Sequence, residues 1–112
     1  MNDQTKKYLE DIALAIQNIE NFLGEKRDFE AYSQNLMLKQ ATERNLEIIG
    51  EAVNYAIKHS PELSITNARR IVDLRNKLIH AYDSIDDATI WAIIVRQLPI
   101  LKEEVNQLLN QE

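Results

Sequence analysis

Residues that interrupt helices are rare in this sequence, and their scarcity limits the folds open to it. Only two glycines and two prolines occur in 112 residues, so few sharp turns are available. The β-branched residues recur at spacings of three and four rather than in alternation, which indicates helices instead of strands. We therefore predict an all-α fold, an antiparallel up-and-down four-helix bundle of long helices.

Apolar spacing and turn residues divide the chain into four predicted helices. The first should cover 3–23 and end at Gly24, a residue suited to the position after a helix. The second should start near Asp28, which can cap it, and continue to about Lys58. Its apolar stripe is formed by residues at helical spacing: Leu38, Leu46, Ile49, Val53 and Ile57.

The third helix is expected after the break at Ser60 and Pro61, because proline disfavours a helical conformation in the residue before it. Ser64 or Thr66 can cap this helix, which should continue to about Tyr82. Its packing residues are predicted to be Ile65, Ala68, Ile71 or Val72, Leu74, Leu78 and Ile79.

The fourth helix should run to about Asn110, after a segment in which Ser84 and Asp87 approximate a capping box. Pro99 removes a backbone hydrogen bond to Val95 and should kink this helix. The predicted apolar face comprises Ile90, Ile94, Leu98, Leu101, Val105 and Leu108.

The segment 74–83 gathers the side chains best suited to catalysis. On a helix, Arg75 and Tyr82 share one stripe, and Asn76 and His80 share the neighbouring one. Arg75 and His80 then lie roughly 140° apart, a gap that the arginine stem can partly close. A guanidinium pairs with phosphate oxygens and an imidazole exchanges protons near neutral pH, so the set suits phosphate chemistry. The alternative is structural: a solvated arginine and a histidine at the edge of the core.

The third predicted helix is also the most basic part of an acidic chain, since it carries Arg69, Arg70, Arg75 and Lys77. Such a cationic strip indicates an anionic substrate. Alternatively, Asp73 and carboxylates from other helices neutralise it.

Gly50 is expected to mark a close contact between helices. In the middle of a helix it costs on the order of 1 kcal/mol relative to alanine, so a packing benefit is expected, and a missing side chain allows another helix to approach. We predict that the approaching helix carries Arg75, and that Glu47 or Glu51 orients its guanidinium. The alternative for these glutamates is a weak surface ion pair.

Composition sets further limits. The chain is long enough for one domain, 1–112, with a modest core. Because so small a domain buries a limited fraction of its surface, association with a second copy would add buried surface. Trp91 and Tyr55 are expected in the core, with a dimer contact as the alternative. A net charge of -5 argues against a general nucleic-acid coat. Without cysteine and with two histidines, neither disulfides nor a thiolate zinc site is expected. No apolar run could span a membrane, so we expect a soluble, cytoplasmic protein.

The motif resembles a known family. Arg75, His80 and Tyr82 read as the R-x4-H-x-Y signature of HEPN-domain proteins, and the chain is similar to the HepT toxins among them. A second block, 41–52, contains an ER pair followed by GEA, as in that family. Two blocks in the expected order, within a helical chain of suitable size, make the resemblance specific.

The resemblance implies a toxin of a type VII-like toxin–antitoxin system that cleaves RNA without a metal or another cofactor. It implies a homodimer in which both copies of Arg75 and His80 line one cleft, with Asn76 as a supporting residue. It also implies a partner, an MNT-type nucleotidyltransferase antitoxin that transfers AMP to Tyr82. A ring packed locally is the alternative for Tyr82. The alternative for the whole chain is a non-catalytic helical module that binds a nucleotide or docks on a partner.

Overall fold

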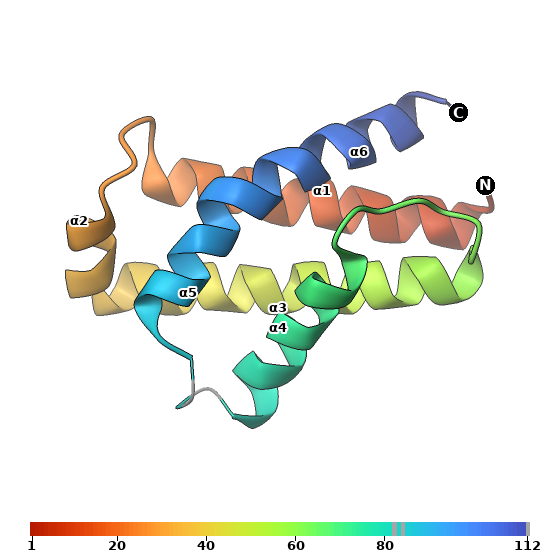
Figure 1. Ribbon diagram of the computed structural model, residues 1–112. Helices are drawn as coiled ribbons and strands as arrows, with labels where there is room; N and C mark the ends of the chain where they lie inside the picture. The colour runs from red at the N-terminus through yellow and green to blue at the C-terminus, as the bar shows by residue number, and fades with distance from the viewer. Residues whose placement is uncertain (82, 84, 112) are drawn as a thin grey trace.

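The computed structural model describes residues 1–81, 83 and 85–111, and the part described is helical throughout except for short connections (Figure 1). Helix α1 covers Asp3–Leu23, as predicted. Asn2 caps it by accepting a hydrogen bond from the backbone N–H of Thr5, at 2.7 Å. Gly24 ends it with a φ of 71°, a left-handed value that glycine adopts without strain.

The predicted second helix is interrupted, and this expectation was wrong. It consists of a short α2, Phe29–Gln34, and a long α3, Leu36–His59. Asn35 takes an extended conformation between them, and its side-chain oxygen accepts a hydrogen bond from Leu38 N–H at 3.0 Å. Asn35 is therefore the N-cap of a new helix, a position that asparagine favours.

Helix α4, Ala68–His80, starts later than the predicted caps Ser64 and Thr66 allow. Its N-cap is Asn67, in the left-handed region at φ 61°, without a capping side-chain bond. Thr66 does not cap the helix, because its hydroxyl donates to the carboxylate of Glu104 at 2.6 Å. The start of α4 is thereby tied to the C-terminal helix.

The C-terminal stretch consists of α5, Asp87–Ala92, a π-helical turn η2, Ile93–Gln97, and α6, Leu98–Asn110. The π turn ends two residues before Pro99, so the predicted disturbance of this helix takes the form of a widened turn. Asp86 caps α5: its side chain accepts from Thr89 N–H at 2.7 Å. Ser84 lies outside the described residues.

The core confirms most of the predicted apolar faces. Helices α1 and α3 lie side by side, α6 packs on α1, and α4 crosses α3 (Figure 1). Among the described parts, α4 has no comparable packing against α5, η2 or α6. Buried predicted residues include Leu46, Ile49, Val53, Ile65, Ile71, Leu74, Leu78, Ile90, Ile94, Leu98, Leu101 and Val105.

The two aromatic residues expected in the core differ. Trp91 is half-buried and packs its ring against Tyr32, with centroids 5.2 Å apart. Tyr55 is 37 % exposed, so its core assignment was wrong; it stacks on Tyr8 at 5.4 Å on the surface formed by α1 and α3. Both rings therefore pack against another aromatic ring of the same chain.

The prediction of an all-α helical bundle is confirmed. No helix within the described residues is long and apolar enough to cross a bilayer.

Candidate active site

Helix α4 carries two of the three motif residues, Arg75 and His80, together with the supporting residue Asn76. Arg75 and Asn76 lie in its second half and His80 is its last residue. The helix ends at Ala81, whose backbone N–H donates to the carbonyl of Lys77 at 2.8 Å. Tyr82, the predicted modification site, lies outside the described residues.

The contact between Gly50 and α4 confirms one prediction. A Cβ atom at Gly50 would clash with the Cβ of Arg75, lie 2.9 Å from its Cγ and lie 3.1 Å from the carbonyl oxygen of Ile71. The helix that approaches Gly50 is therefore the one that carries Arg75, as the missing side chain indicated. This contact fixes the position of the Arg75 Cβ and Cγ atoms against α3.

The Arg75 guanidinium is held from within α4. Its Nη1 donates to the side-chain oxygen of Asn76 at 2.9 Å. Its Nε is buried and has no hydrogen-bond partner among the described residues, so this arginine retains unused donors. Because Asn76 lies about 100° around the helix from Arg75 in the direction of His80, the bond draws the guanidinium toward the histidine side.

The predicted role of the two glutamates is not seen within the chain. Among the described residues neither Glu47 nor Glu51 forms an ion pair with Arg75: Glu47 lies 3.8 Å from Arg44, and Glu51 is exposed. Arg44 is three residues from Glu47 on the same helix, where side chains meet without any tertiary contact. The local pair forms in place of the expected one.

His80 is exposed, and so is its neighbour Ile79, at 42 %. Ile79 was predicted to pack in the core. Helix α4 crosses α3 near Gly50, beside Ile71 and Arg75, and Ile79 lies a full turn beyond that crossing. An uncovered isoleucine therefore adjoins the exposed imidazole.

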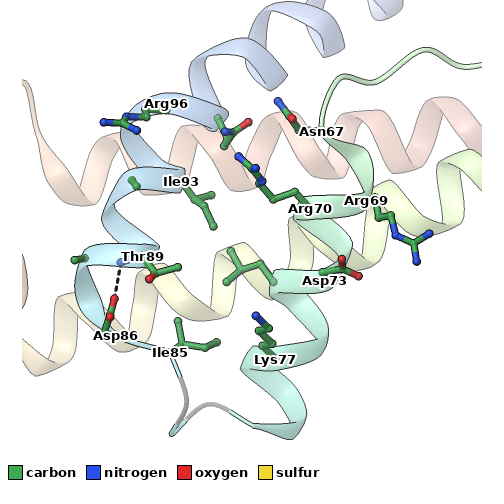
Figure 2. Close-up of a pocket in the computed structure, with 14 residues that line it drawn as sticks. Asn67, Arg69, Arg70, Asp73, Lys77, Ile85, Asp86, Thr89, Ile93 and Arg96 are labelled. Atoms are coloured by element: carbon green, nitrogen blue, oxygen red, sulfur yellow. Dashed lines mark hydrogen bonds between the residues drawn. The ribbon is translucent and has the colours of Figure 1, made fainter.

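The face of α4 next to His80 borders an open cleft, called here the α4 cleft, of about 950 Å³ between α4 and the α5–η2 stretch. Figure 2 shows Arg70 and Lys77 pointing into it, whereas the side chains of Arg69 and Arg96 point away from it on its two sides. Two carboxylates also line it, Asp73 and Asp86; the complete lining is Asn67, Arg69, Arg70, Asp73, Leu74, Lys77, Ile85, Asp86, Ala88, Thr89, Ala92, Ile93, Arg96 and Gln97.

The alternative raised from the sequence was neutralisation of the cationic strip by Asp73 and other carboxylates. Asp73 lies among these cations in the cleft lining, but close ion pairs are not formed within the described residues. Arg69, Arg70, Lys77 and Arg96 have no carboxylate within 4.0 Å there. The contribution of Arg96 was missed, because it lies on another predicted helix and only the tertiary arrangement brings it to α4. The sequence did show that Arg96 lies outside the apolar face of the fourth predicted helix, which indicated an accessible cation but not its neighbours.

A separate polar cluster lies where α2, α3 and α5 meet. Asp87 accepts from the Ser33 hydroxyl at 3.0 Å and pairs with Lys39 at 3.1 Å. Burial, with the negative charges of Asp87 and Glu47, raises the pKa of the Glu43 carboxyl, against the opposing effect of Lys39. Burial likewise raises the pKa of Tyr32, whose hydroxyl has no partner among the described residues.

The helical bundle and the Arg75–His80 segment together define an all-α domain of the HEPN class. The family model described as "Ribonuclease HepT-like" matches residues 12–108. The "Probable ribonuclease HepT" of Thermococcus cleftensis is 38% identical over 112 residues, covering 96% of this chain and 98% of that protein. The "Putative RNase MJ0125" of Methanocaldococcus jannaschii is 32% identical over 106 residues, covering 94% and 90%. The chain belongs to the HepT-like ribonuclease family. No solved structure gives a significant match.

Proposed function

We propose that this chain is a metal-independent endoribonuclease that acts as the toxin of a toxin–antitoxin pair. The observation that carries the proposal is the arrangement on α4: a guanidinium with unused donors, hydrogen-bonded to Asn76, on the same helix as an exposed histidine. Membership of a ribonuclease family supports RNA as the substrate.

The reaction needs a base, an acid and a cation. The base removes the proton of a ribose 2′-hydroxyl, and that oxygen attacks the adjacent phosphorus. Arg75 binds the phosphate and stabilises the charge that builds on the phosphorane. As the bond from phosphorus to the 5′-oxygen breaks, the acid protonates that oxygen. The products carry a 2′,3′-cyclic phosphate and a 5′-hydroxyl.

A homodimer supplies what a single chain lacks. One chain contributes a single motif histidine, and its Arg75 and His80 start from positions about 140° apart around α4. Two α4 helices facing each other across a two-fold axis would place two histidines and two arginines at one cleft, so that one His80 acts as base and the partner subunit's His80 as acid. The exposed Ile79 would then be covered.

Substitution of the two central residues tests the proposal. His80→Ala and Arg75→Ala should each lower cleavage of single-stranded RNA by at least about a hundredfold, with an unchanged far-ultraviolet circular dichroism spectrum. His59→Ala is the matched control: His59 is also exposed, at the end of α3, where its Nδ1 lies 2.9 Å from the carbonyl oxygen of Tyr55 and its ring lies against Tyr8. Cleavage retained in both motif variants would refute the nuclease.

Mixed dimers test whether two histidines act together. If both are required, mixing wild-type and His80→Ala chains in equal amounts leaves wild-type chains about half as active as before, because half of them pair with a disabled copy. Chains that act alone would lose nothing. Analytical ultracentrifugation of the same mixtures would establish that the chains exchange.

We further propose that an MNT-type nucleotidyltransferase neutralises the toxin by transferring AMP to Tyr82. A bulky anionic group two residues after His80 would repel RNA and block access to the motif. Intact-mass measurement after incubation with the partner enzyme and ATP should show one added AMP, absent in Tyr82→Phe. An unchanged mass, or an adduct mapped elsewhere, would count against Tyr82.

A further inference from the structure

We propose that the α4 cleft binds the phosphate backbone of single-stranded RNA on one side of the cleavage point. The cleft would act as a substrate-binding groove outside the Arg75–His80 centre. This inference rests on the proposed nuclease function and adds a substrate contact to it.

Charge is the first argument. The whole chain has a net charge of -5, yet four cations and two carboxylates line the cleft. Hydrogen bonds from Thr89 lower the pKa of Asp86 and so keep it ionised, which leaves the lining with four positive and two negative side chains, an excess of positive charge. None of the four cations forms an ion pair within the described residues. An acidic protein thus gathers a local excess of positive charge at this concave surface, which favours anionic ligands.

The position of the cations is the second argument. Arg70 and Lys77 are seven residues apart on one face of α4 and both point into the cleft (Figure 2). That spacing corresponds to about 10 Å along the helix, or about three steps of a stacked strand. His80 follows Lys77 by three residues, so it lies on the neighbouring surface of the helix. A strand bound by Arg70 and then Lys77 therefore continues toward the imidazole.

The chemistry of the lining favours RNA over an acidic polypeptide. Buried apolar side chains, Leu74 and Ile93, lie between the cations on the two sides of the cleft. A nucleotide strand offers flat bases and riboses for such apolar surface together with regularly spaced phosphates for the cations. The guanidinium of Arg70 is also suited to paired contacts with phosphate oxygens.

Direct binding measurements test the groove independently of catalysis. We would measure the Kd of an oligouridylate of about twelve nucleotides, over a range of salt concentrations, for full-length His80→Ala protein with and without Arg70→Gln and Lys77→Gln. Both cations are exposed, so the fold should persist. Loss of two phosphate contacts should weaken binding by about tenfold at low salt. It should also reduce the slope of the logarithm of the binding constant against the logarithm of the salt concentration, here called the salt slope, by about 1.4. A trinucleotide bound at the cleavage centre can reach Lys77 but is too short to reach Arg70, so the two substitutions should weaken its binding less than that of the longer strand.

The matched control is Lys26→Gln with Arg27→Gln, an adjacent exposed pair after α1 with the same loss of charge and no place in the cleft. An unchanged Kd and slope in the cleft variant, or an equal loss in the control, would overturn the inference. Tighter binding of a poly-glutamate peptide of equal charge, abolished by the cleft substitutions, would assign the cleft to an acidic protein and also overturn it. Wild-type protein that binds RNA through the cleft without cutting it would refute the nuclease and leave the groove standing.

Discussion

The layer of α1, α3 and α6 and the helix α4 are held in place in different ways. Helix α1 buries an apolar stripe along its whole length against α3, and α6 covers α1 with residues that are almost fully buried. Helix α4 buries only Ile71, Leu74 and Leu78 and packs extensively on α3 alone within the described part of the chain. The first region is a continuous core, and the second is a short helix attached to it along one side.

Because of this difference, the residues that stabilise the fold and the residues proposed to act on RNA lie in different parts of the molecule. The residues proposed for RNA cleavage, Arg75, Asn76 and His80, lie on α4, whose polar sides face solvent or the α4 cleft. A helix with few buried contacts opens at lower free energy than the rest of a domain, and it can carry unpaired cations without disturbing the core. Gly50 connects the two regions, since α4 approaches α3 there so closely that a Cβ atom would clash with Arg75.

Truncation of one isoleucine in each region would measure this difference most directly. Ile49 in α3 is 0% exposed and Ile71 in α4 is 3% exposed. We expect Ile49→Ala to lower the free energy of unfolding by about 4 kcal/mol and Ile71→Ala by about 2 kcal/mol, because a cavity below a singly attached helix can collapse more easily. Urea unfolding would give both values. Equal losses would show that α4 is as firmly integrated as α3.

Gly50→Ala should separate the two regions at their contact. Alanine improves the helix propensity of α3 by about 1 kcal/mol, but its Cβ clashes with the Arg75 side chain and the Ile71 carbonyl. We expect a net loss of about 2 kcal/mol and a marked loss of RNA cleavage, since α4 must shift. Unfolding and cleavage assays on one preparation would test both effects.

Gly24→Ala is the control for that substitution. Gly24 has a φ of 71°, and a Cβ atom there would have no neighbour within 4 Å, so alanine is strained at this position without touching α4. It should cost about 1 kcal/mol and leave cleavage per folded molecule unchanged. If Gly50→Ala behaved in the same way, the Gly50 contact would have no functional role.

The sequence was sufficient for features that depend on local periodicity. The bounds of α1 follow from its apolar spacing and Gly24, and a mid-helix glycine correctly indicated which helix approaches α3. The break at Asn35 was missed because no glycine or proline marks it. There, the buried Tyr32 anchors the short α2 against Trp91 on α5, a contact between distant parts of the chain.

Features that depend on long-range pairing could not be predicted. Thr66 has the side chain of a cap, but Glu104, 38 residues away, takes its hydroxyl. Glu47 had two possible arginine partners, and the nearer one in sequence is the one it contacts. The α4 cleft depends on two helices that diverge after a connection, and no residue pattern encodes that angle.

A buried hydroxyl pair offers a smaller test of the well-packed region. The hydroxyls of Thr5 and Ser60 are 2.7 Å apart and join the start of α1 to the end of α3. Thr5→Val leaves the buried Ser60 hydroxyl without its partner and should cost about 1–2 kcal/mol. Adding Ser60→Ala should cost less than the two single losses combined, because the unpaired group is removed. A double-mutant cycle by urea unfolding would measure the coupling; strict additivity would contradict it.

The smallest expected effect is a gain in the free energy of unfolding, from a substitution in the polar cluster where α2, α3 and α5 meet. Because burial raises the folded-state pKa of Glu43, the folded protein holds this proton more tightly than the unfolded chain, and ionisation of Glu43 at neutral pH opposes folding. Glu43→Gln should therefore stabilise the protein by less than about 1 kcal/mol at pH 7. The gain should shrink as the pH falls through the raised folded-state pKa and vanish below the ordinary value for glutamate, where both states are protonated. Thermal unfolding across this pH range would measure it, with Glu51→Gln as the exposed control on the same helix. A gain that persisted in acid would mean that packing of the amide, rather than relief of a buried charge, accounts for it.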